Sequence, residues 1–300
     1  MELIWIIIIT ITRIITIWDR ISICITNINT ITISINTFTF TINTHHTIVT
    51  IIVIPTFNEA KNLENLVDKI FFLHPMVNII VVDDNSPDGT GDIADALFRR
   101  YPRFRVIHRP YQAGLGSAYL EGFRAALREK ADLIMEMDAD FSHDPRYIGH
   151  LIAASEGADL VIGSRYVNGV RVEGWRFRRL LLSKLANIFV SFVLVRPVWD
   201  FTAGFRCYRR TVLETIDLES TRSDGYAFQI ELTYLTFKHG FKVSEVPIIF
   251  RERAHGYSKI SRKVVWEAFW ITLKCHAPWR EIWRHLPFLF KDYNEFVEKS

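Results

Sequence analysis

Apolar and polar residues follow two different periods along most of the chain, and this pattern predicts an α/β fold. The run IVTIIVIP at 48–55 is a continuous β-branched stretch that ends at proline, as expected for a buried parallel strand. Apolar positions at helical spacing follow over 58–73, with Asn58 as the expected N-cap. The same order of strand and helix recurs through 78–166, which predicts a mainly parallel sheet with flanking helices.

The first 48 residues do not share this pattern. Ile, Thr and Asn dominate here, and Gly, Pro, Ala and Lys are absent. Alternating Ile and Thr suits a strand, but no turn signal divides the segment into hairpins. A membrane anchor is one interpretation, although Arg13 interrupts an apolar run shorter than the ~20 residues of a span. A signal peptide would have a small-residue cleavage site and a basic start, and this segment has neither. Its composition therefore favours a biased extension without packed structure.

The C-terminal part is rich in basic and aromatic residues. After residue 180 the sequence has no run of about 20 uncharged apolar residues, so it predicts no clear transmembrane helix there. Helices over 263–300 have the composition of interfacial segments. We therefore expect an extension at 1–48, one α/β domain at 49–262 and amphipathic helices at 263–300.

Overall charge argues against one class of partner. The formal net charge is only +3, so bulk charge does not indicate nucleic-acid binding.

Carboxylates cluster where the predicted strands end, which is where parallel sheets bind their ligands. Asp138 and Asp140 are two residues apart after the apolar run LIMEM and can converge on one hard cation. Mg²⁺ or Mn²⁺ is then expected to bridge diphosphate oxygens; the alternative is a solvated acidic turn. Asp83 and Asp84 follow another strand and suit hydrogen bonds to a base or ribose, whereas Asp88 is more simply a helix cap.

Basic residues follow in the second half of the chain. Arg165 comes after a strand and is expected to reach phosphates. Three arginines open an apolar helix that contains Ser183, and they suit either an anionic lipid headgroup or a solvated face: Arg176, Arg178 and Arg179. Arg253 and Lys259 lie in a glycine-containing loop that suits a lid over a diphosphate or an ordinary surface loop.

Eight segments between about Thr50 and Lys274 together resemble the family 2 glycosyltransferases of the GT-A fold, and among them the polyprenol (dolichol) phosphate mannose synthase group. They are PTFNEAKNL, VVDDNSPDGTGDIA, AGLGSAYLEGF, EMDADFSHDP, GSRYVNG, FTAGFRCYRR, GYAFQIEL and EVPIIFRERAHGYSKIS. The resemblance implies a Rossmann-like GT-A fold.

The resemblance also implies roles for individual residues. Nucleotide contacts fall to Pro55, Phe57, Glu59, Val81 and Asp83, with Phe57 in place of the usual Tyr. Asp138, Ala139 and Asp140 are expected to contact the sugar diphosphate and the metal. Ser142 stands where some relatives have a Gln that binds the metal. The acceptor phosphate falls to Arg165, Arg179 and Ser183, and the donor diphosphate is gripped by Arg253 and Lys259.

The activity implied by the resemblance is inverting transfer of mannose from GDP-mannose to a polyprenyl (dolichyl) phosphate. Two alternatives stay open: a glucosyltransferase that uses UDP-glucose, and a non-catalytic subunit that binds nucleotide sugars. Intact Asp138, Asp140, Arg165 and Arg253 argue against the second. The resemblance also implies that the protein is located at the cytosolic face of a plasma or endoplasmic reticulum membrane. A small membrane subunit or the N-terminal segment would help to attach it there.

Overall fold

The computed structural model describes residues 21–27, 30–35, 38–43, 48–219, 221, 223, 225–252 and 262–275. The chain forms two compact units, Met1–Ile48 and Val49–Ser300. In the first unit, β1 (Ile21–Asn27), β2 (Thr30–Ile35) and β3 (Phe38–Asn43) pair as an antiparallel sheet. The alternating Ile and Thr residues therefore form strands here even without turn signals in the sequence.

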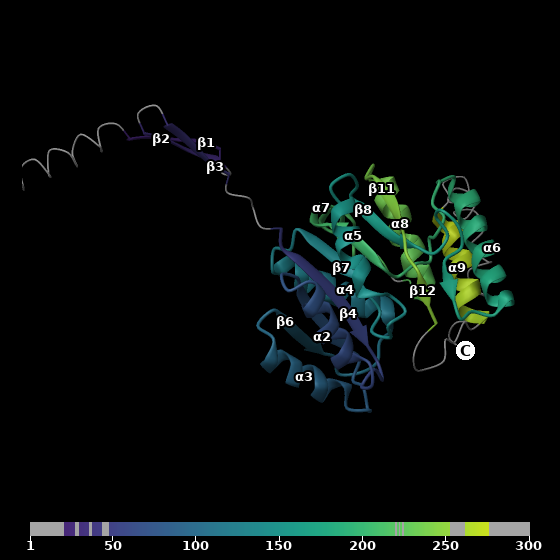
Figure 1. Cartoon of the computed structure of the whole chain (residues 1–300). Helices are drawn as coiled ribbons and strands as arrows, with labels where there is room; N and C mark the ends of the chain where they lie inside the picture. The colour runs from purple at the N-terminus through teal and green to yellow at the C-terminus, as the bar shows by residue number, and fades with distance from the viewer. Residues whose placement is uncertain are drawn as a thin grey trace, which may run out of the picture. The chain divides into compact units, whose positions relative to one another are not determined.

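The second unit is built on a seven-stranded sheet of order β11-β8-β10-β7-β4-β5-β6 (Figure 1). Its strands are β4 (Thr50–Thr56), β5 (Asn78–Asp83), β6 (Phe104–His108), β7 (Leu133–Glu136), β8 (Leu160–Ser164), β10 (Arg206–Arg209) and β11 (Val243–Pro247). Within this sheet β10 runs antiparallel to both of its neighbours, and the other pairs are parallel. The mainly parallel α/β fold predicted from the sequence is confirmed.

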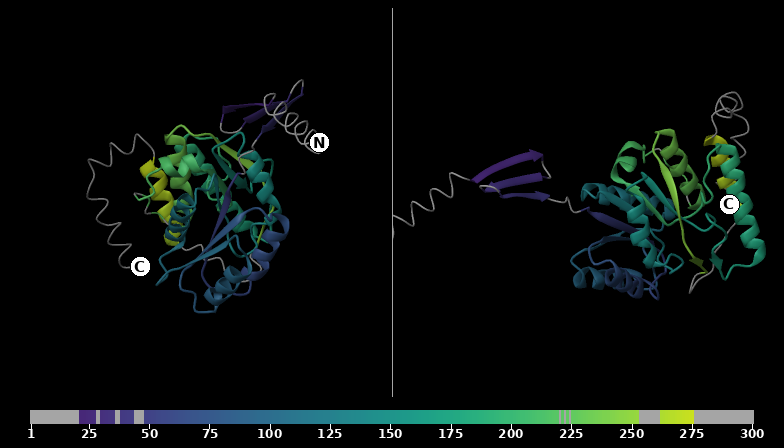
Figure 2. Two further views of the ribbon diagram at one scale, coloured as in Figure 1. Left: turned by 90° about the vertical axis from the view of Figure 1, so that its left-hand side faces the viewer. Right: turned by 45° about the horizontal axis from the view of Figure 1, so that its top comes forward.

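Helices cover both faces of this sheet (Figures 1 and 2). They are α2 (Leu63–Leu73), α3 (Thr90–Arg100), α4 (Leu115–Arg128), α5 (Ile148–Ala154), α6 (Phe177–Leu194), α7 (Arg210–Thr215), α8 (Gly225–Lys238) and α9 (Arg262–Cys275), with a 3₁₀ turn at Pro145–Tyr147. A two-stranded sheet pairs β9 (Val172–Glu173) with β12 (Phe250–Arg251). Among the described helices, none combines the length and apolar character that crossing a membrane needs.

The pleat of β4 divides the core into two layers, because successive side chains point to opposite faces. Ile51 and Val53 pack with α4, α7 and α8, whereas Ile52 and Ile54 pack with α2, α3 and α5. Gly122 brings α4 close to the strand, since a Cβ at this position would lie 2.2 Å from Val53 Cγ1.

Helix α9 belongs to the second unit and packs beside α6. The rings of Phe189 on α6 and Phe269 on α9 stack with centroids 5.4 Å apart. Figures 1 and 2 show these two helices side by side along the edge of the unit. Residues 276–300, the remainder of the expected C-terminal helices, lie outside the described residues.

The start of α2 differs from the sequence prediction. The helix begins at Leu63 with Asn62 at the N-cap position, and Asn58 instead adopts a left-handed φ of 61° in the loop. The backbone N–H of Asn58 donates to Ser86 Oγ at 3.0 Å, so this loop is tied to the loop that follows β5. The longer β4–α2 loop forms one wall of the cavity described next.

Candidate functional site

A cavity of about 200 Å³ opens where the parallel strands β4, β5 and β7 end. Its walls contain six of the residues predicted for the donor site: Pro55, Phe57, Glu59, Asp138, Ala139 and Asp140. Asp84, Gln112, Gly114 and Leu115 complete most of the lining. Segments separated by more than 80 positions in the sequence thus meet at the edge where such sheets bind ligands.

Asp138 is held from two sides while its carboxylate stays partly exposed. Tyr119 donates its hydroxyl to Asp138 Oδ1 at 3.2 Å, and burial together with the charge of Asp138 raises the pKa of Tyr119 well above 10. The backbone N–H of Asp138 donates to His143 Nδ1 at 3.1 Å, so this nitrogen carries no proton. His143 is itself fixed between Phe205 and Phe250.

Asp140 is buried beside an unsatisfied hydroxyl. Its Oδ1 accepts the backbone N–H of Ser142 at 3.0 Å. The buried Ser142 Oγ has no hydrogen-bond partner among the described residues. Within the part of the chain that the structure describes, no cluster of three or more His, Cys, Asp or Glu side chains forms a metal cage. The carboxylates of Asp138 and Asp140 and the hydroxyl of Ser142 are suitable ligands for Mg²⁺ or Mn²⁺. Mg²⁺ is commonly bound by one or two carboxylates, and substrate phosphates complete its coordination shell.

Asp83 and Asp84, at the end of β5, have different surroundings. Asp83 is buried, and its carboxylate accepts from Thr56 Oγ1 at 3.0 Å and from Ser86 Oγ at 2.6 Å. Its neighbour Asp84 lines the cavity, and Val81 is fully buried in the core. Nucleotide contacts by Asp83 and Val81 stay predictions.

Sequence reasoning missed Arg109, the partner of Asp84. Arg109 donates to Asp84 Oδ1 at 2.6 Å and to Ser117 Oγ at 2.7 Å, with both charged side chains nearly buried. It lies one residue beyond the end of β6. The rule that ligand-site residues follow the ends of parallel strands points to this position for a basic residue as much as for an acidic one.

Asp88 fixes the loop before α3. Its carboxylate accepts the backbone N–H and the hydroxyl of Thr90, the first residue of that helix, and the backbone N–H of Ala60. Burial alone would raise the pKa of Asp88, but these hydrogen bonds outweigh it and lower the pKa. The predicted helix cap is displaced by one residue: Gly89 is the N-cap of α3, and Asp88 before it bonds the first helical residue.

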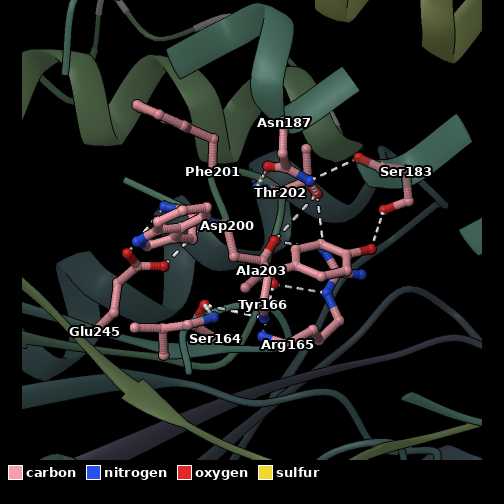
Figure 3. Close-up of polar contacts among 12 residues, drawn as sticks. Ser164, Arg165, Tyr166, Ser183, Asn187, Asp200, Phe201, Thr202, Ala203 and Glu245 are labelled. Atoms are coloured by element: carbon pink, nitrogen blue, oxygen red, sulfur yellow. Dashed lines mark hydrogen bonds and ion pairs between the residues drawn. The ribbon is translucent and has the colours of Figure 1, made fainter. Parts of the chain in front are cut away.

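Directly after β8, which is separated from β7 only by β10, Arg165 is buried in an ion pair (Figure 3). Its guanidinium bonds both oxygens of Asp200, at 2.7 and 2.6 Å, and donates to Thr202 Oγ1 at 2.7 Å. Burial lowers the pKa of Arg165, but the carboxylate of Asp200 raises it by more, so the group stays charged. The guanidinium is committed to these partners in this structure, and a contact with an acceptor phosphate stays a prediction.

A chain of hydrogen bonds continues from this ion pair to α6 (Figure 3). Asn187 of α6 donates to Thr202 Oγ1 at 3.1 Å, and Tyr166 donates its hydroxyl to Ser183 Oγ at 2.7 Å. The predicted acceptor residue Ser183 is thereby anchored to the residue that follows Arg165.

Ser183 lies in the wall of a second, almost wholly apolar cavity of about 280 Å³. The cavity is formed by α6, α8 and α9 and is lined by Trp175, Leu182, Leu185, Ala186, Phe189, Val190, Thr202, Tyr226, Ile230, Ala268 and Phe269. Arg179 lies nearby, with its guanidinium 4.0 Å from the Trp175 ring centre and Nη1 3.1 Å from Glu252. Arg253 and Lys259, predicted to grip the donor diphosphate, lie outside the described residues.

A buried polar group links the two cavities. Arg206 donates to the carbonyl oxygens of Phe201 and Ala203 and so fixes the loop between them. Thr202 in this loop lines the apolar cavity, whereas a Cβ on Gly204 would lie 3.8 Å from Asp138 Oδ1 in the polar one.

Glu136 lies in the same buried group. It accepts from Gln229 Nε2 at 2.5 Å. Burial raises the pKa of Glu136 to about 7, although the charge of Arg206 opposes this shift.

Comparison with known proteins agrees with this geometry. The model of "Glycosyl transferase family 2" matches residues 51–217. The chain is 51% identical over 221 residues to a polyprenol monophosphomannose synthase of Mycolicibacterium smegmatis, covering 73% of this chain and 83% of that protein. It is 42% identical over 216 residues to an undecaprenyl-phosphate mannosyltransferase of Micrococcus luteus, covering 72% and 89%.

A solved structure shares the fold. The glucosyl-3-phosphoglycerate synthase of Mycobacterium tuberculosis, crystallised with Mn²⁺, UDP and phosphoglyceric acid, superposes with a TM-score of 0.60 at 21% identity. The superposition covers 77% of this chain and 79% of that one. The chain belongs to glycosyl transferase family 2.

Proposed function

We propose that this protein transfers mannose from GDP-mannose to a polyprenyl phosphate with inversion at the anomeric carbon, giving a polyprenyl-phosphate β-mannose. Two cavities of opposite polarity on either side of the Thr202–Gly204 loop carry this proposal. A carboxylate-lined cavity suits a sugar nucleotide with its metal, and an apolar cavity suits a lipid. Relatives named for mannosyl transfer to polyprenyl phosphates support this acceptor and this sugar.

The donor would occupy the polar cavity. Asp138, Asp140 and Ser142 would hold Mg²⁺ or Mn²⁺, which when bound offsets the negative charge of the diphosphate and of the departing GDP. Phe57 and Glu59 would contact the nucleoside from the β4–α2 loop. Tyr119 and the backbone contact with His143 would keep Asp138 in position.

The acceptor would place its first isoprene units in the apolar cavity and its phosphate near Ser183 and Arg179. The phosphate is already an anion, so the reaction needs no general base. Its main obstacle is repulsion between two phosphate groups, and an arginine offsets this through paired hydrogen bonds. A phosphate oxygen then forms a bond to the anomeric carbon while the bond from that carbon to the diphosphate breaks, and GDP leaves with the electron pair.

We infer a peripheral position on the cytosolic face of a membrane, where such an acceptor is available. Arg176 and Arg178 are exposed at the start of α6 and support attraction to anionic headgroups. A plasma or endoplasmic reticulum membrane, and a small membrane-anchored subunit, stay predictions for this chain.

The test is a transfer assay with labelled donor. Full-length protein is incubated with polyprenyl phosphate, Mg²⁺ or Mn²⁺ and either GDP-[¹⁴C]mannose or UDP-[¹⁴C]glucose, and the label is counted in the organic phase. We expect label from GDP-mannose alone and a β-linked product. Label from UDP-glucose alone would replace the proposed sugar, and GDP-mannose binding without transfer to lipid would favour a non-catalytic subunit.

A further inference from the structure

The guanidinium of Arg179 has both an aromatic ring and a carboxylate as neighbours. It lies over the Trp175 ring, 4.0 Å from the ring centre, and its Nη1 donates to Glu252 Oε1 at 3.1 Å. Arg179 lies one helical turn before Ser183, so the two side chains share one side of α6. The arginine proposed to bind the acceptor phosphate therefore already has an anionic partner.

Two short strands bring Glu252 to this position. Strands β9 and β12 pair in parallel, and the backbone N–H of Glu252, directly after β12, donates to the carbonyl oxygen of Glu173 at 3.0 Å. Gly174 follows β9 with a left-handed φ of 87°, and a Cβ there would lie 2.9 Å from Glu252 Cβ. Because this position has no side chain, the two strands approach closely and the Glu252 carboxylate reaches the first turn of α6.

The two arginines predicted to bind the acceptor phosphate differ in the exposure of their partners. The side chain of Asp200, the partner of Arg165, is fully buried, whereas that of Glu252 is 50% exposed. Opening a buried ion pair is costly, but an exposed pair changes an equilibrium by no more than about fivefold. Of these two pairs, only that of Arg179 opens to an incoming anion at small cost.

A phosphate monoester competes well with a carboxylate for such a guanidinium. It carries a charge of about −1.5 to −2 at neutral pH and three strong acceptor oxygens, whereas an ionised carboxylate carries about −1. Transfer of a sugar converts the monoester into a diester with a single negative charge, so its advantage over the carboxylate becomes smaller. Charge therefore favours displacement of the carboxylate before the transfer and its return afterwards.

We propose that Glu252 is a positioning residue that acts as the exchangeable counter-ion of Arg179. It holds the guanidinium beside Trp175 until the acceptor phosphate replaces it, and it pairs with the guanidinium again as the product leaves. The pair also limits the affinity for any phosphate monoester, because the ligand binds only the fraction of the protein in which the pair is open. The inference rests on the proposed function for the identity of the acceptor.

A matched pair of variants on the two short strands tests this role. Glu252→Gln removes the carboxylate beside Arg179, and Glu173→Gln removes a neighbouring one, which is 57% exposed and pairs with Arg251 at 2.9 Å. A short-chain, water-soluble prenyl phosphate is titrated into each full-length protein in a calorimeter, without donor or divalent cation. We expect Glu252→Gln to bind it about 2–5-fold more tightly than wild type, and Glu173→Gln to bind it as wild type.

Steady-state transfer provides a readout that a merely structural role would not change. Glu252→Gln should lower the KM for the prenyl phosphate and the inhibition constant of the mannosylated product by the same factor of about 2–5, with the KM for GDP-mannose unchanged. Tighter binding by Glu252→Gln in a protein that transfers no mannose would support the counter-ion role and overturn the proposed function. Equal affinities of the two variants, or weaker binding by Glu252→Gln, in a protein that transfers mannose would overturn the counter-ion role alone.

Discussion

The two cavities use their charged residues in opposite ways. In the polar cavity, Asp138 keeps a carboxylate that is 27% exposed, and Glu59 and Asp140 also line the wall, whereas Asp84 there is paired with Arg109. Beside the apolar cavity, Arg165 and Asp200 are buried and neutralise each other. The polar cavity thus keeps an exposed carboxylate at Asp138, whereas the buried pair beside the apolar cavity holds α6 and the Thr202–Gly204 loop in place.

This difference separates residues that bind from residues that position. A charge that lines a cavity affects ligand affinity first, and a buried pair affects stability first, because breaking it leaves an ion without a partner. Substitutions in the two regions should therefore have different signatures.

The largest effect is expected for the buried pair. Asp200→Ala leaves Arg165 buried without its counter-ion, and we expect the free energy of unfolding to fall by about 3–5 kcal/mol in urea titrations. Glu219→Ala, which removes an exposed pair with Arg124, should cost no more than about 1 kcal/mol. Equal losses in the two variants would mean that the Arg165 pair is not a structural element.

Arg179 should behave as a ligand residue despite lying on the acceptor side. With a water-soluble prenyl phosphate, Arg179→Ala should lower the acceptor kcat/KM about 100-fold and leave GDP-mannose affinity within about twofold. The adjacent Arg178→Ala is the matched control and should keep both constants. Unimpaired transfer by Arg179→Ala would remove this residue from the acceptor site.

Glu136 offers a pH test of the buried group between the cavities. Its pKa is raised from 4.5 to about 7, so the folded state holds a proton that the unfolded state releases at lower pH. The stability contributed by this proton is complete below about pH 4.5 and is lost as the pH rises through about 7. Glu136→Gln should flatten this part of the pH dependence of the free energy of unfolding, which is worth up to about 3 kcal/mol. An unchanged slope would mean that Glu136 is ionised throughout.

The smallest effect is expected at the cavity mouth. Phe57 is 37% exposed, and Phe57→Tyr supplies the hydroxyl usual in the family. We expect GDP-mannose to bind about 2–10-fold more tightly in calorimetric titrations, because one added hydrogen bond typically strengthens ligand binding by this amount. Phe57→Leu should bind more weakly than wild type, and identical affinities for Phe and Tyr would exclude a hydroxyl contact.

Much of the fold could be predicted because its signals are local. The β-branched run of β4 and the helical periods after it identify the elements from neighbouring residues alone. Strand direction is not local in this sense, because nothing in residues 200–210 indicates that β10 runs antiparallel between β7 and β8. The predicted start of α2 is wrong because Asn58 is a residue type typical of N-caps, whereas its backbone lies in the loop that lines the cavity and bonds to Ser86.

The candidate site divides in the same way. The carboxylates of the polar cavity follow strand ends, so their position along the chain is enough to predict that Asp138 and Asp140 lie together there. The partner of Arg165 lies 35 residues away, and the partner of Asp84 lies 25 residues away. Such pairings depend on the folded arrangement of the chain, and the sequence alone does not distinguish a buried ion pair from a charge that awaits a phosphate.

Mannose transfer is expected to take place at the Asp138–Asp140 edge of the polar cavity. The most direct measurement is the initial rate of label transfer from GDP-mannose to polyprenyl phosphate, with and without divalent cation, by wild type, Asp140→Asn and Asp144→Asn. Asp144 is the control because it is also nearly buried but pairs with Arg146 and does not line the cavity. We predict cation-dependent transfer by wild type and Asp144→Asn, and a rate at least about 100-fold lower for Asp140→Asn. A folded Asp140→Asn protein that transfers mannose as fast as wild type would show that Asp140 has no part in the transfer.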